Sequence, residues 1–153
     1  MVKISISQVK KLRKETAAPV MECQQALEEA GGDLEKAKKV LKKKGMARAA
    51  KKASRETSCG LIETYVHNTG KVAAMVELCC ETDFVARTDE FKDLAHELAM
   101  QVASMKPKDV KALLKQEYIR DPERKVKELI KETIGKLGEN ITIRRFERFE
   151  LGG

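Results

Sequence analysis

Asp83 and Phe84 place a carboxylate beside a large aromatic side chain at a corner of the chain, a combination that could bind a partner. The alternating apolar run 72–80 predicts a strand before this corner, and the periodic run from Phe91 predicts a helix after it. Corners usually carry Gly, Pro, Asn or Ser. An aromatic residue there either packs into its own core or projects as an anchor for a partner. The pattern alone favours the core, where most aromatic side chains lie.

Residue types that commonly do catalytic or redox chemistry are few, and they form no familiar pattern. The four cysteines make no CxxC pair and no metal-ligand spacing, and they are Cys23, Cys59, Cys79 and Cys80. Adjacent Cys79 and Cys80 would face opposite sides of a strand, so buried thiols are favoured over a thiol redox protein that uses this pair. Neither His67 nor His96 has a neighbouring nucleophile, and no strand leads into a Gly-rich phosphate loop. We therefore expect no catalytic residue, no metal site, no cofactor and no enzymatic activity.

Positive charge is concentrated in residues 36–55, which hold ten Lys or Arg and no Asp or Glu. The net charge of the whole chain is +7, so the remaining residues sum to −3. A local cationic segment can meet nucleic acid, the ribosome or an acidic protein face. No aromatic residue interrupts the segment, which disfavours stacking on single-stranded nucleic acid. Two interpretations stay open: a solvated helix and linker, or a ribosome- or RNA-binding module that acts through residues 36–55.

Residues 1–45 predict a domain of three short helices joined by tight turns. Ser5 and Gln8 have the spacing of a capping box at the start of the first helix. Pro19 suits the first turn of the second helix. A Gly pair ends that helix, and Gly45 is expected to end the third. A bundle of this size is marginally stable by itself and suits a docking module.

Residues 46–58 are basic and rich in Ala, and they predict a helical linker. Residues 59–153 then change character. Alternating runs within 61–80 predict a hairpin, two amphipathic helices follow, and alternation over 141–151 predicts a third strand. The expected fold class is α+β, with a three-stranded antiparallel sheet packed against helices on one face.

Composition excludes a spanning segment in this sequence. The chain has 153 residues, of which 42% are hydrophobic and 4% aromatic, with no Trp. No apolar run reaches the roughly 18 residues that a membrane helix needs, and the N-terminus has no signal-peptide h-region. We expect no membrane contact and a cytoplasmic protein.

Motifs along nearly the whole chain resemble translation elongation factor Ts. The matching segments are Leu12-Arg13, Cys23-Gln24-Gln25-Ala26-Leu27, Gly32-Asp33, Ala49-Ala50-Lys51-Lys52, Glu81-Thr82-Asp83-Phe84-Val85-Ala86, Gly138-Glu139-Asn140-Ile141 and Arg144-Arg145-Phe146. The Thr-Asp-Phe-Val and Gly-Glu-Asn-Ile runs are the most specific of them. The resemblance implies a guanine-nucleotide exchange factor that binds GDP-bound elongation factor Tu during translation elongation.

The same resemblance implies a role for the corner. Thr82, Asp83, Phe84 and Val85 would be presented to the region around the magnesium ion of the partner, and GDP release would follow from disturbance of the Mg²⁺ and phosphate site. On that basis Phe84 projects as a wedge, against the expectation from pattern alone.

The resemblance also makes the N-terminal domain similar to a ubiquitin-associated domain that docks on the nucleotide-binding domain of the partner. Leu12, Arg13 and Met21 are the contacts expected there. Family members often have Gly-Ala-Gly-Met-Met-Asp-Cys-Lys-Lys where residues 17–25 of this chain read Ala-Ala-Pro-Val-Met-Glu-Cys-Gln-Gln.

A short segment between Met105 and Val126 and the lack of a second core repeat mark a short form of the family. A single three-stranded sheet leaves edges and an uncovered face. In short members of the family, two copies of the chain pair and so cover the exposed parts of the sheet. The resemblance therefore implies a homodimer. Direct binding of nucleic acid is not expected from it.

Overall fold

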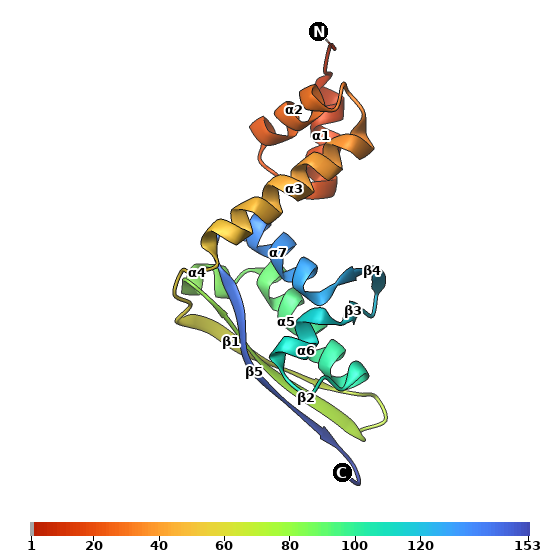
Figure 1. Ribbon diagram of the computed structural model, residues 1–153, viewed down its shortest axis with the longest axis vertical. Helices are drawn as coiled ribbons and strands as arrows, with labels where there is room; N and C mark the ends of the chain where they lie inside the picture. Colours follow the sequence, from red (N-terminus) through yellow and green to blue (C-terminus); the bar gives the residue numbers. More distant parts are fainter. Residues whose placement is uncertain (1) are drawn as a thin grey trace. The chain divides into compact units, whose positions relative to one another are not determined.

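A computed structural model describes residues 2–153 and divides the chain into two units, 1–48 and 49–153 (Figure 1). Each unit has a hydrophobic cluster of its own. Within residues 2–153, the structure contains no helix that is both long and apolar enough to span a lipid bilayer.

The first unit is a bundle of α1 (Ile6–Thr16), α2 (Val20–Glu29) and the first part of α3 (Leu34–Lys52). The predicted capping box is confirmed, because the Ser5 hydroxyl accepts from the Gln8 N–H and the Gln8 side chain accepts from the Ser5 N–H at 2.9 Å. Apolar residues spaced three or four apart bring one face of each helix together. The buried residues of this bundle are Leu12, Cys23, Ala26, Leu27, Ala37 and Leu41.

Helix α3 runs through Gly45 to Lys52, so the predicted end of this helix at Gly45 is wrong. A glycine inside a helix costs about 1 kcal/mol relative to alanine, which does not break a helix whose neighbours favour it. Gly45 is buried, and Met46, Ala47 and Arg48 after it are good helix formers. The division between the two units falls within this helix.

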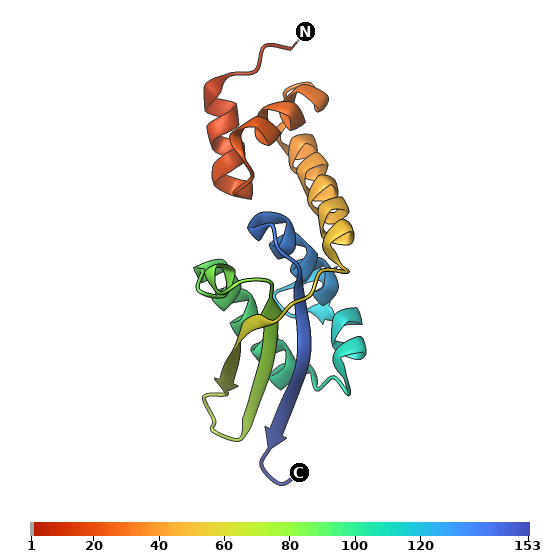
Figure 2. The ribbon, with the colours of Figure 1, turned by 90° about the vertical axis from the view of Figure 1, so that its left-hand side faces the viewer.

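The second unit is built on a three-stranded antiparallel sheet with the order β1 (Cys59–Val66), β2 (Val72–Cys80) and β5 (Ile141–Glu150). Helices α5 (Asp89–Met105) and α7 (Val126–Leu137) cover one face of this sheet (Figures 1 and 2). Alternation along β2 buries Ala74, Val76, Leu78 and Cys80 against them. The α+β class and the antiparallel three-stranded sheet are confirmed.

The opposite side of the sheet carries large apolar side chains in contact with solvent. We call it the open face, and its exposed members are Ile62, Val66, Met75 and Phe149. They alternate with the buried positions of the same strands, as one-sided packing requires.

Between α5 and α7 the chain forms α6 (Val110–Lys115) and a small ladder of β3 (Glu117–Tyr118) and β4 (Asp121–Lys125). The ladder was not predicted, because its short polar strands show no alternation. Buried Gln101 of α5 holds it in place: its amide nitrogen donates to the Glu117 carbonyl at 3.0 Å, and its amide oxygen accepts from the Ile119 N–H at 3.0 Å.

Candidate functional site

The corner between β2 and α5 is a single helical turn, α4 (Asp83–Ala86). Thr82 is its N-cap, with the hydroxyl accepting from the Val85 N–H at 3.4 Å. Val85 and Ala86 belong to the core of the second unit, whereas Asp83 and Phe84 are exposed. One side of the turn therefore anchors it, and the other presents a carboxylate and an aromatic ring together.

Phe84 is 84% exposed, so the expectation from pattern alone that it packs into the core is wrong. Because so little of its surface is buried, Phe84 can contribute only little to the packing of its own unit. Such a side chain is typical of a binding anchor, which gains its energy only when a partner buries it. The structure thus brings Thr82, Asp83, Phe84 and Val85 together, with two of the four side chains facing solvent.

Residues far along the chain support this turn from behind. The Glu139 carboxylate accepts from the Thr82 N–H at 2.9 Å and from the Thr82 hydroxyl at 2.7 Å. Glu81 accepts in turn from the Asn140 N–H at 2.9 Å. In the sequence, Glu139 and Asn140 stand out only as part of the Gly-Glu-Asn-Ile motif, which predicts no role for either residue. Their separation from the corner left no local signal that could have assigned one.

The residues predicted as contacts in the N-terminal unit have different environments. Leu12 is fully buried in the bundle, so it can affect a partner only through the packing of the helices. Arg13 and Met21 are exposed, and the neighbouring Val20 is exposed as well. Ala17 ends α1 in the left-handed conformation, with φ 56°. Such a position favours glycine, and glycine is the residue that family members often have there.

Several basic side chains of residues 36–55 bind carboxylates of the bundle. Lys38 contacts Glu15 at 2.5 Å, Lys44 contacts Glu29 at 2.7 Å, and Arg48 pairs with Glu22. Other members are exposed on one side of α3, at the spacing of neighbouring helix turns: Lys36, Lys39 and Lys43. The basic segment therefore has both a structural part and a solvent-facing part.

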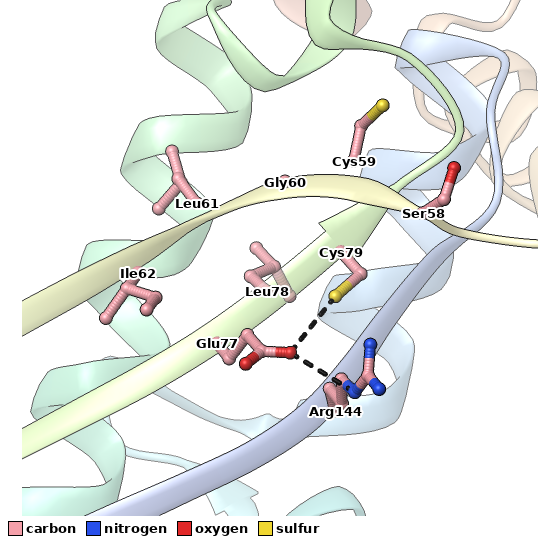
Figure 3. A pocket seen from close by; sticks show the side chains of 9 residues that line it. All are labelled: Ser58, Cys59, Gly60, Leu61, Ile62, Glu77, Leu78, Cys79 and Arg144. Carbon is pink, nitrogen blue, oxygen red and sulfur yellow. Dashed lines mark hydrogen bonds and ion pairs between the residues drawn. The ribbon is translucent and has the colours of Figure 1, made fainter.

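A shallow hollow of ≈ 210 Å³ lies at the Cys59 end of the sheet (Figure 3). Glu77 accepts from the Cys79 thiol at 3.8 Å and from the Arg144 guanidinium at 3.4 Å there. Burial raises the pKa of the Cys79 thiol, and it raises the pKa of the Cys80 thiol to about 11. Thiols in this state are poor nucleophiles, which argues against redox chemistry at this pair.

No cluster of three or more His, Cys, Asp or Glu among residues 2–153 is arranged to hold a metal ion. The most distinctive surface feature is instead an exposed aromatic and a carboxylate on a turn that buried residues hold in place. An arrangement of this kind is typical of a protein that acts by binding another protein.

Comparison with known proteins shows which family of protein-binding proteins this chain resembles. The family model for elongation factor TS matches residues 81–153, which include the corner and the segment that supports it. Elongation factor Ts of Coprothermobacter proteolyticus is 46% identical, over 99% of this chain and 100% of its own length. Elongation factor Ts of Thermotoga maritima is 44% identical, over 99% and 98% respectively, and that of Thermoanaerobacter pseudethanolicus is 43% identical, over 97% and 95%. The chain belongs to the elongation factor Ts family.

The alignments with these relatives extend over 194–196 positions, whereas this chain has 153 residues. The relatives therefore contain residues without a counterpart in this chain.

Proposed function

We propose that this protein is a guanine-nucleotide exchange factor that binds GDP-bound elongation factor Tu and promotes GDP release during translation elongation, in the cytoplasm. Membership of the elongation factor Ts family supports this role. The observation that carries the proposal is Phe84, which is 84% exposed on a turn whose other side is buried.

The proposed mechanism depends on coupling between two ligands of elongation factor Tu. A GTPase holds GDP and Mg²⁺ through a phosphate-cradling loop and metal-ligand contacts. Insertion of Phe84 between nearby elements of the partner would stabilise a conformation in which these contacts are distorted. Asp83 would bring a negative charge that competes for donors or disturbs the metal's ligands. By linkage, the exchange factor weakens GDP binding by the same factor as GDP weakens binding of the exchange factor.

In the proposed complex with elongation factor Tu, the N-terminal domain, the linker and the α+β domain would have different roles. We assign residues 1–45 to a domain similar to a ubiquitin-associated domain that docks on the partner's nucleotide-binding domain. In it, Arg13 and Met21 offer exposed side chains, and Leu12 maintains the bundle. Residues 46–58 would connect it to residues 59–153, which carry the wedge.

The open face supports the proposal that the protein works as a homodimer. Ile62, Val66, Met75 and Phe149 expose apolar surface on one side of the sheet, and such a patch is stabilised when a second copy covers it. Sedimentation at micromolar concentration should then give the mass of two chains. A monomer with full exchange activity would contradict this part of the proposal.

The function itself is tested by release of fluorescent GDP from elongation factor Tu. Catalytic amounts of this protein should accelerate release in the presence of excess unlabelled GDP, and the rate should saturate with concentration. An unchanged release rate, with the protein folded and in excess, would refute the proposed function.

A further inference from the structure

We infer that Glu139 is a positioning residue that caps the α4 turn from a distant part of the chain and so fixes the orientation of Asp83 and Phe84. This inference rests on the proposed function, because it assigns Glu139 a role in the presentation of the proposed wedge. It concerns a side chain that contacts the turn, not the partner.

The hydrogen bond to Glu139 fixes the direction in which the Thr82 hydroxyl donates, and so leaves its lone pairs free to accept from the α4 turn. A hydroxyl has one proton and two lone pairs. The Thr82 hydroxyl donates that proton to one Glu139 carboxylate oxygen at 2.7 Å, which leaves its lone pairs for the Val85 N–H at 3.4 Å. The other carboxylate oxygen accepts from the Thr82 N–H at 2.9 Å. Both bonds to the carboxylate are charge-assisted, so they are stronger than bonds to a neutral acceptor.

A local capping box normally supplies the acceptor for the N-cap N–H. In α1 the side chain of Gln8, three residues after Ser5, performs this task. The equivalent position in α4 is Val85, which is buried in the core and has no acceptor on its side chain. Glu139 therefore replaces the missing local residue from 57 positions further along the chain.

The α4 turn needs such support because it has little stability of its own. It contains four residues, and an isolated turn of this length does not persist in water. Burial of Val85 fixes one side, but the exposed ring of Phe84 contributes almost nothing to holding the turn. A rigid presentation lowers the entropy that is lost when a partner binds, so the cap should affect affinity and exchange.

The chain segment that carries Glu139 is fixed by the residues on either side of it. Gly138 ends α7 with φ 77°, a conformation that glycine adopts without strain, and so turns the chain toward β5. Asn140 is 3% exposed, and its amide nitrogen donates to the carbonyls of Arg55 at 2.8 Å and Ala53 at 3.4 Å. Its N–H donates to the Glu81 carboxylate. Segment 138–140 is thus fixed on both sides of Glu139.

The first test measures the turn in the free protein. Glu139→Ala should increase the hydrogen-exchange rate of the Thr82 and Val85 amides by about tenfold, the usual consequence of losing an N-cap. In Glu139→Gln the exchange rates of these two amides should lie between those of the wild type and of Glu139→Ala. The neutral amide oxygen can still accept from the Thr82 N–H, but the hydroxyl proton loses its charged acceptor. The matched control is Glu123→Ala, which removes an exposed carboxylate of β4 and should leave these amides unchanged.

The second test is a double-mutant cycle on GDP release. Glu139→Ala should lower the exchange efficiency by about tenfold in the wild-type background. In a Phe84→Ala background the same change should lower the exchange efficiency by a clearly smaller factor, because only Asp83 then remains to be positioned. A residue that contributes only to global stability would give the same loss in both backgrounds.

Two results would overturn the inference. One is an unchanged exchange rate of the Val85 amide in Glu139→Ala, and the other is full additivity with Phe84→Ala. Failure of the proposed function is distinguishable, since the wild type would then not accelerate GDP release. The amide measurement uses the protein alone and would still decide whether Glu139 holds the turn.

Discussion

Replacement of Phe84 by alanine tests whether this side chain is an exposed wedge or a core residue. The two alternatives predict different losses in the free energy of unfolding. A phenylalanine side chain has about 200 Å² of surface, and an exposed fraction of 84% leaves only about 30 Å² of it buried. At about 25 cal/mol per Å² this buried area contributes about 0.8 kcal/mol to the free energy of unfolding. A phenylalanine in the core would contribute about 3–5 kcal/mol. Phe84→Ala should therefore leave the fold almost as stable as the wild type.

The affinity for elongation factor Tu, by contrast, should fall strongly in Phe84→Ala. An aromatic anchor at the centre of an interface contributes about 2–4 kcal/mol, which corresponds to about a 30- to 1,000-fold increase in the Kd of the complex with elongation factor Tu. Urea unfolding measures the first quantity, and titration with GDP-bound elongation factor Tu measures the second.

Phe91→Ala provides the matched control. Phe91 is fully buried at the start of α5, only seven positions from Phe84, and its truncation should destabilise the fold by about 3–5 kcal/mol. The reasoning is refuted if Phe84→Ala destabilises the protein as strongly as Phe91→Ala while GDP release per folded molecule stays normal. That result would place Phe84 among the core residues in solution.

Other predictions concern charge and thiol chemistry. Asp83→Asn keeps the shape of the side chain and should slow GDP release about tenfold, the effect of one charge-assisted hydrogen bond; chelation of Mg²⁺ should reduce this defect, and an undiminished defect would exclude a role at the metal. Replacing Lys36, Lys39 and Lys43 together by Gln should lower the association rate about threefold to tenfold at low salt with an unchanged maximal exchange rate, whereas a loss of salt-dependent RNA binding would favour the ribosome- or RNA-binding alternative. With a pKa raised to about 11, about one in 1,000 Cys80 thiols is ionised at pH 8, so iodoacetamide should label Cys80 in the folded protein more than 100-fold more slowly than free cysteine, and the rate should rise toward pH 11. Rapid labelling at pH 8 would contradict burial of this thiol.

Periodicity and local turn chemistry predicted most of the second unit. The alternation of 72–80 and the apolar spacing from Phe91 each identify an element, because one buried face requires a period of two residues in a strand and 3.6 in a helix. The end of α3 was not predictable by the same reasoning. Gly45 has the local signature of a stop, but its burial in a helix with favourable neighbours outweighs its intrinsic cost. The ladder of β3 and β4 depends on hydrogen bonds with buried Gln101, one donated and one accepted by its side-chain amide, which no local pattern reveals.

At the candidate site, too, local sequence predicts the contacts between neighbouring residues but not those that depend on the packing of distant segments. The capping box of α1 could be predicted because Ser5 and Gln8 are three residues apart, and that spacing is set by the helix itself. In α4 the same task falls to Thr82 and Glu139, and their proximity depends on how β2, α7 and β5 pack in the folded unit. Local sequence therefore identified Asp83 and Phe84 as unusual but gave the wrong environment for Phe84. Its exposure follows from a turn that is held by Val85 and Ala86 on one side and by a distant carboxylate at its start, so that nothing requires the aromatic ring to be buried. A side chain that contributes little to the stability of its own fold remains available for a partner, as a binding anchor must be.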